Sequence, residues 1–248
     1  MYKSRVPLLG LVVLLLGTAT AGGVPPELRA AAVLAEADHE GIIAFEVTWE
    51  TQASGGPFHR YFRYRNAYVY DGERFVDARA LQRNDNGKIA GQAELDVQTR
   101  KLVDEHRREP SAGFAVPFDD RHFSEYRYTI VPCTSGCSQS DVAIAFAAKN
   151  RDSLHGDGRM VLDRDAHVKR LEYVSQSAPS FRGAKLQEAH VTIERGPVLP
   201  GYWGTILMHS RLVGHYGFIT GEALQTARYD HYERFQSISA ALAALQRP

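Results

Sequence analysis

Hydrophobic and polar residues alternate along most of this chain, which is typical of half-buried β-strands. The alternation is clearest over residues 42–52, where every second residue is apolar and the residues between are mainly polar. The apolar side of this segment consists of Ile43, Phe45, Val47 and Trp49. Residues 58–70 continue the pattern, with Phe62 and Tyr64 on the inward side. Asp71-Gly72 follows directly and is a strong signal for a hairpin turn.

The same pattern returns in the second half of the chain. Strands are expected within residues 122–132, 141–149, 159–163, 167–176, 184–195 and 205–235. A Pro/Gly-rich connection is expected between the last two segments, at residues 196–204. Helices are expected near residues 25–41, 92–109 and from Ser237 onward, because these segments are rich in Ala, Leu and Glu and carry suitable end residues.

These elements predict a mainly β (α+β) fold. Strands and helices do not alternate as in βαβ units, so a parallel sheet is not expected. We expect one large curved antiparallel sheet that forms an incomplete β-barrel, with a few covering helices. A single domain over residues 22–248, with a helical insertion near residues 92–109, accounts for the pattern.

The N-terminus has the three parts of a secretory signal peptide. Lys3 and Arg5 precede an apolar run over residues 6–16, and Ala19-Thr20-Ala21 supplies small residues for cleavage. The apolar run is too short to span a bilayer, which takes about 20 residues. We therefore expect cleavage near Ala21 and a periplasmic or secreted protein that does not span the membrane.

Cys133 and Cys137 are the only cysteines of the chain. Disulfides persist in exported proteins, and the residues between the two cysteines, Thr134-Ser135-Gly136, favour a turn between two strands. The spacing differs from that of redox CxxC motifs, and nearby ligands that would complete a zinc knuckle are missing. We expect a structural disulfide at a hairpin tip, while a redox or metal role stays open as the alternative.

Composition and charge exclude some partners. Without residues 1–21 the chain holds 27 basic and 29 acidic residues, which argues against a nucleic-acid partner. The run HRYFRYR at residues 59–65 interleaves Arg and aromatic residues, but on a strand it predicts ordinary Arg–aromatic contacts.

Two further runs are FRYRNAYVYDGERFV at residues 62–76 and GRMVLDRDAHVKRLEYV at residues 158–174. With the exported N-terminus and the order of the elements, they resemble the periplasmic lipoprotein-carrier (LolA-like) family and the RseB-like envelope-stress regulators. The resemblance implies an incomplete antiparallel barrel whose concave face, covered by helices, holds acyl chains. The segments 202–221 and 229–235 match no motif of that family, so no ligand-binding residue is transferred from it.

Candidate chemistry is sparse. The late residues His209, His215, Asp230 and His231 are the best group for a metal, but His209 and His215 would lie about 20 Å apart on one extended strand. We therefore expect no metal and no cofactor. The carboxylates of Asp119, Asp120, Asp163 and Asp165 occur in turn-like contexts, and no GxSxG nucleophile motif is present.

The sequence favours a binding or carrier protein over an enzyme. The expected cavity lining is aromatic and aliphatic, and its candidates are Ile43, Phe45, Val47, Trp49, Phe62 and Tyr64. The expected partner is an apolar small molecule, a lipid or a lipidated protein of the cell envelope. Two alternatives stay open: a secreted hydrolase that uses the late His/Asp/Tyr segment, and an envelope interaction module without catalysis.

Overall fold

The computed structural model describes residues 23–38, 40–108, 116–133, 137–150, 152, 155–175, 185–216 and 219–246. The expected signal peptide at residues 1–21 and the expected turn at residues 134–136 lie outside this part. Within it, no helix is both long enough and apolar enough to cross a bilayer.

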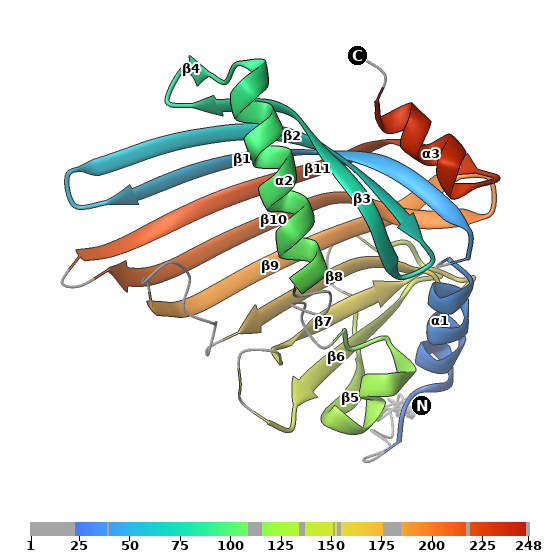
Figure 1. Ribbon diagram of the computed structural model, residues 1–248. Helices are drawn as coiled ribbons and strands as arrows, with labels where there is room; N and C mark the ends of the chain where they lie inside the picture. Colours follow the sequence, from blue (N-terminus) through green and yellow to red (C-terminus); the bar gives the residue numbers. More distant parts are fainter. Residues whose placement is uncertain are drawn as a thin grey trace, which may run out of the picture.

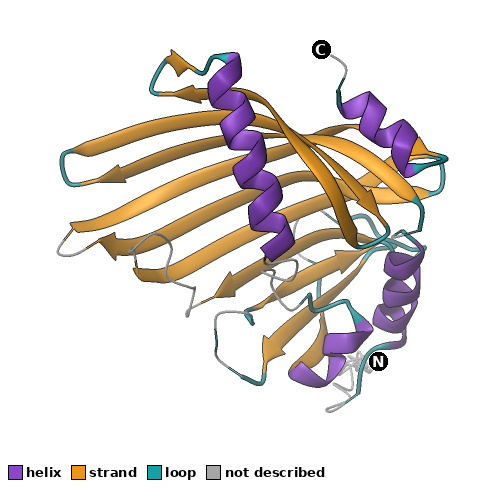
Figure 2. Ribbon diagram, in the orientation of Figure 1, coloured by secondary structure: helices purple, strands orange, loops and turns teal. Residues whose placement is uncertain are grey.

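The chain forms one antiparallel sheet of eleven strands that curves but does not close (Figures 1 and 2). The strands lie in the order β4-β3-β2-β1-β11-β10-β9-β8-β7-β6-β5. They are β1 (Ile42–Gly55), β2 (Phe58–Asp71), β3 (Arg74–Asp85), β4 (Lys88–Ile89), β5 (Tyr126–Val131), β6 (Val142–Ala148), β7 (Asp157–Leu162), β8 (Val168–Ser175), β9 (Lys185–Leu199), β10 (Tyr202–Tyr216) and β11 (Ile219–Phe235). The expected mainly β fold with an open curved sheet is confirmed.

Three α-helices and one short 3-10 helix accompany the sheet. They are α1 (Pro26–Ala37), α2 (Gln92–Arg108), α3 (Ile238–Leu245) and η1 (Asp120–Glu125). Pro26 begins α1, where its missing N–H is not needed. The Ser237 hydroxyl accepts a hydrogen bond from the Ala240 N–H at 3.2 Å and caps α3, as the sequence predicts.

Several hairpins turn through residues in the left-handed region. Gly72 has φ +64° between β2 and β3, and Asn86-Gly87 has φ +51° and +89° between β3 and β4. The Asp71-Gly72 signal predicts the first of these turns.

The expected Pro/Gly-rich connection at residues 196–204 is wrong. β9 continues to Leu199 and β10 begins at Tyr202, so the turn contains only Pro200 and Gly201. Pro197 is paired with Trp203 inside the ladder. Pairing along the long hairpin therefore outweighs the local preference of Pro and Gly for loops.

Cys133 and Cys137 form the expected disulfide, with their Cα atoms 6.1 Å apart. The bond joins the segment after β5 to the segment before β6, two strands that pair directly.

The last strand, β11, pairs with the first, β1, over the length of both. This pairing brings the N-terminal hairpins beside the C-terminal ones and makes one continuous sheet. It also defines the two faces of the molecule, because directly paired residues of antiparallel strands point to the same side.

Candidate functional site

One face of the sheet carries a continuous row of apolar side chains. The strand registers join Trp49 to Ala227, Ala227 to Met208, and Met208 to Ile193. Beyond Ile193 the row continues across the next three strands. Its members, from β2 to β6, are Tyr64, Trp49, Ala227, Met208, Ile193, Leu171, Met160 and Ile144. A line of aliphatic and aromatic side chains therefore crosses eight strands, and the Tyr64 hydroxyl is its one polar group.

The two ends of this row are packed against helices. At the β6–β8 end, Leu28 and Ala31 of α1 belong to the same buried cluster as Ile144 and Met160. At the other end, Leu102 of α2 belongs to a cluster with Val47 and Ala227. The row therefore lies on the helix-covered face, which is the concave side that α2 crosses in Figure 1.

The large side chains in the middle of the row are half-buried, while Ala227 between them is fully buried. Trp49, Ile193 and Met208 are neither fully buried nor fully exposed, and Phe45 beside them is the same. Met208 packs against both buried clusters and so connects them. We call Phe45, Trp49, Ile193 and Met208 the apolar strip. The Met208 thioether is flexible and fills irregular gaps, whereas the Trp49 indole offers a large rigid apolar surface.

Tyrosines surround the Phe45 end of the strip. The Phe45 ring lies 5.7 Å from that of Tyr68, 6.0 Å from that of Tyr229 and 5.3 Å from that of Tyr232. Burial raises the pKa of Tyr68, and it raises the pKa of Tyr229 to about 12. These phenols therefore stay neutral at physiological pH and add no charge to the apolar surface.

The cover over this end, α2, is weakly anchored. Of its 17 residues only Leu102 is buried. Val103 packs beside it, and the His106 ring stacks on Phe75 at 4.8 Å. Burying one Leu side chain stabilises the docked helix by about 1.5–3 kcal/mol. The helix is thus held much less firmly than the strands below it.

The opposite cover, α1, is fixed by a buried ion pair. Asp38 at its C-terminal end accepts a hydrogen bond from the Trp203 N–H at 3.0 Å and lies 3.5 Å from Arg195 Nη2. Arg195 also donates to the Trp203 carbonyl at 2.9 Å. Burial lowers the pKa of Arg195, and the Asp38 charge opposes that shift. A buried pair of this kind is costly to break from one side, so α1 is the firm cover and α2 the weak one.

The six residues expected to line a cavity all lie on the concave side. Ile43 and Val47 are almost fully buried, at 3% and 2% exposed. Phe45, Trp49, Phe62 and Tyr64 are half-buried. Sequence reasoning missed Ile193 and Met208, which complete the strip, and the only available signal was the alternation of residues 189–193 and 206–212.

Two described pockets lie away from the strip. One, of about 570 Å³, lies at the free end of the β1–β2 hairpin and is lined mainly by polar residues such as Gln52, His59 and Glu222. The other, of about 530 Å³, lies between β4 and α2 and includes Arg83, Lys88 and Glu94. Neither of these two pockets contains a residue of the strip.

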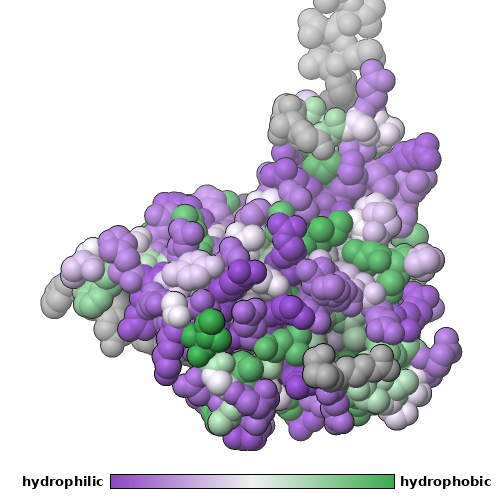
Figure 3. All heavy atoms as spheres, turned by 90° about the horizontal axis from the view of Figure 1, so that it is seen from above, coloured by the Kyte–Doolittle hydropathy of each residue, from purple (hydrophilic) through white to green (hydrophobic). Residues whose placement is uncertain are grey.

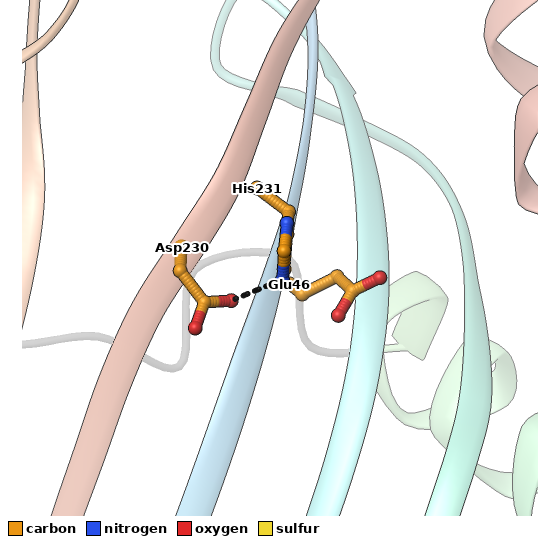
Figure 4. A group of neighbouring side chains, drawn as sticks. All are labelled: Glu46, Asp230 and His231. Atoms are coloured by element: carbon orange, nitrogen blue, oxygen red, sulfur yellow. Dashed lines mark ion pairs between the residues drawn. The ribbon is translucent and has the colours of Figure 1, made fainter.

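The late histidines are not gathered into one group. His209 is exposed on β10 and its Nδ1 lies 3.1 Å from the Thr226 hydroxyl. His215 pairs with Thr220, ten residues along β11 from Asp230, which is about 34 Å on an extended strand. Asp230 and His231 do lie together. Glu46, which sequence reasoning did not select, lies beside them (Figure 4).

A search of protein-family models and a search of curated proteins gave no match to this chain. Among solved structures, the chain is similar to a domain from Vibrio parahaemolyticus described as an outer membrane lipoprotein-sorting protein, at 11% identity and a TM-score of 0.36, over 89% of this chain and 100% of that one. It is also similar to a DUF1329 family protein from Desulfovibrio piger, at 10% identity and a TM-score of 0.38, over 89% and 98% of the two chains.

A third similar structure is the MucA/MucB complex of Pseudomonas aeruginosa, at 9% identity and a TM-score of 0.26, over 86% of this chain and 100% of that one. The lipoprotein-sorting description agrees with the resemblance seen in the sequence. At these identities and TM-scores the matches carry no inference about ligand or activity.

Proposed function

We propose that this chain is an exported periplasmic binding or carrier protein whose apolar strip holds an acyl chain, of a lipid or of a lipidated protein. The observation that carries the proposal is the apolar row, half-open at its centre and covered by a weakly anchored helix. The signal-like N-terminus supports export, with cleavage near Ala21.

The magnitudes favour entry of an acyl chain under α2. Displacing the Leu102 side chain costs about 1.5–3 kcal/mol, whereas each methylene buried from water gains about 0.8 kcal/mol. Moving α2 as a whole would also break the hydrogen bonds that Thr99 and Gln98 accept from Ala80 N–H and Arg83. Burial of roughly four methylenes therefore offsets the lost contact. A chain of fatty-acid length has enough methylenes to do this and still extend along the strip.

The surface away from the strip fits a carrier that moves through water. Seen from above, hydrophobic residues appear as separate patches among hydrophilic ones (Figure 3). The late histidines do not form one group, because His209 and His215 lie apart from Asp230 and His231. The carrier proposal therefore rests on the apolar row, and the hydrolase alternative rests on the Asp230–His231 pair alone.

The proposal predicts saturable binding of a fluorescent fatty acid, and weaker binding after Trp49→Ala. Trp49 lies at the centre of the strip and is half-buried, so its loss should reduce affinity more than it lowers Tm. Fluorescence titration gives the affinity, and thermal unfolding of the same samples gives Tm.

Leu224→Ala is the matched control. Leu224 is 49% exposed, and its register partner Gln52 points to the face of the sheet opposite Trp49, so Leu224 lies outside the strip. This variant should bind as the unchanged chain does. If no saturable binding is seen and Trp49→Ala lowers the free energy of unfolding by the roughly 3–5 kcal/mol typical of a core Trp, the strip is ordinary core and the proposal fails.

A further inference from the structure

A bulge in β11 brings two chemically reactive side chains to the same place. The register between β1 and β11 shifts between Ala44 and Glu46, where β11 contributes extra residues. His231 lies in this bulge with φ +51°, a conformation that L side chains adopt at a cost. In a regular strand Asp230 and His231 would point to opposite sides, but here both approach Glu46 of β1 (Figure 4).

The three side chains offer converging donor atoms. One carboxylate oxygen of Glu46, one of Asp230 and one ring nitrogen of His231 all lie within 4.8 Å of one another. The group is on the side of β1 opposite the strip, because Glu46 alternates with Phe45 and Val47. It is therefore separate from the proposed acyl site.

One carboxylate oxygen of each acidic residue in this group is shielded from water and has no hydrogen bond. For Asp230 it is Oδ1, which lies 3.9 Å from His231 Nε2; the side chains of Asp230 and His231 are otherwise 40% and 68% exposed, so the site is open to solvent. Glu46 Oε2 is also shielded; Arg65 Nε lies 2.7 Å from it as an ion pair, but the angles do not form a hydrogen bond. A shielded carboxylate oxygen without a donor is unfavourable, and a bound cation would remove that cost.

We propose that Glu46, Asp230 and His231 bind one Zn²⁺ ion. One imidazole and two carboxylates form a donor set that zinc accepts, whereas magnesium and calcium prefer oxygen donors alone. Three protein ligands leave the fourth tetrahedral position for water or for a group from a partner. Arg65 would stay beside Glu46 and orient its carboxylate, as outer-shell groups do in zinc sites.

The donor atoms are preassembled but must move closer. Zinc–nitrogen and zinc–oxygen bonds are about 2.0–2.2 Å long, so the donors would contract from within 4.8 Å to roughly 3.3 Å of one another. Two of the ligands come from adjacent positions of one bulge and the third from the paired strand. The direct pairing of Glu46 with Asp230 fixes two of the Cα positions, and His231 follows Asp230 in the chain.

The test is zinc binding by the full chain, expressed with its own N-terminus and without a histidine tag. After chelator treatment, ZnCl₂ is titrated by calorimetry and by competition with a chromophoric chelator. We expect one ion per chain, at least tenfold weaker binding for Asp230→Asn and for Glu46→Gln, and loss of binding for His231→Ala.

His231→Gly separates ligation from folding. Glycine adopts φ +51° without strain, so this variant should keep or raise Tm while it loses zinc. His209→Ala removes an exposed imidazole outside the group and should bind zinc as the unchanged chain does. Absence of zinc binding, or binding that His231→Gly leaves unchanged, would overturn the proposal. His122 and His155 both contact the Glu125 carboxylate elsewhere in the molecule, at 2.7 and 2.9 Å. Zinc binding that is lost on His122→Ala and kept on His231→Gly would also overturn the proposal, because it would place the ion there.

Discussion

His155 is the residue whose charge state the structure fixes most clearly. Its Nδ1 lies 2.7 Å from Asp152 Oδ1, and its Nε2 lies 2.9 Å from Glu125 Oε2. Because both ring nitrogens face carboxylates, the ring must be an imidazolium to donate to both. Burial of the ring opposes protonation, but the two hydrogen bonds outweigh burial and raise the pKa of His155.

This geometry predicts that stability falls as pH rises through the folded-state pKa of His155. A raised pKa contributes stability that is complete below the unfolded-state value of about 6.5 and is lost at higher pH. We expect the free energy of unfolding to decrease across this range. In His155→Gln that part of the decrease should be missing. Chemical unfolding at several pH values between 5.5 and 8.5 measures it.

The matched control is His209→Gln, which changes an exposed histidine and should keep the pH dependence of the unchanged chain. Identical pH profiles for the unchanged chain and His155→Gln would show that His155 is not held as an imidazolium.

At the scale of elements, the two long helices differ in how they are held. α1 buries Leu28, Ala31 and Ala35, and the Asp38–Arg195 pair fixes its end. α2 buries only Leu102. Segments with few buried contacts open locally at a small free energy, while well-packed elements open only with the whole domain.

Hydrogen exchange should therefore be faster in α2 than in α1, although α2 is the longer helix. The comparison is made on native protein by mass spectrometry of peptides from both helices and from β1. We expect the α2 peptides to exchange well before those of α1 and β1. Equal protection of α2 and β1 would contradict the description of α2 as a weakly held cover.

The elements also show what the sequence could predict. Alternation at Ile43–Trp49 gave the strand and its buried side, and Ser237 gave the start of the last helix, because both signals are local. The sequence predicted a connection at residues 196–204 because Pro and Gly favour loops locally, whereas the structure continues the β9–β10 hairpin through most of that segment. A register shift between Thr205 and Leu207 further obscured the alternation that places Met208 on the strip.

The zinc group could not be predicted for a related reason. Pairing of the first strand with the last has no local signal, so nothing in the sequence puts Glu46 beside Asp230. The positive φ of His231 cannot be predicted from the sequence either, because histidine does not indicate a left-handed position as glycine does. Long-range pairing and backbone irregularity decide this site, and both come from the assembled sheet.

The whole molecule is one open sheet with two faces of different chemistry. The concave face carries an apolar row that α1 closes firmly at one end and α2 covers loosely at the other. The convex side of β1 and β11 carries the Glu46, Asp230 and His231 group. The central claim is that an acyl chain lies along the row.

Quenching of a single tryptophan by brominated fatty acid tests that claim most directly, because bromine quenches only on close approach. The chain has two tryptophans: Trp49 on the strip, and Trp203, which stacks on His167 at 4.4 Å, five residues along β10 from Met208. In Trp203→Phe, which keeps Trp49, we expect strong saturable quenching; in Trp49→Phe, which keeps Trp203, we expect little. Equal quenching in the two variants, or none in Trp203→Phe, would contradict an acyl chain on the apolar strip.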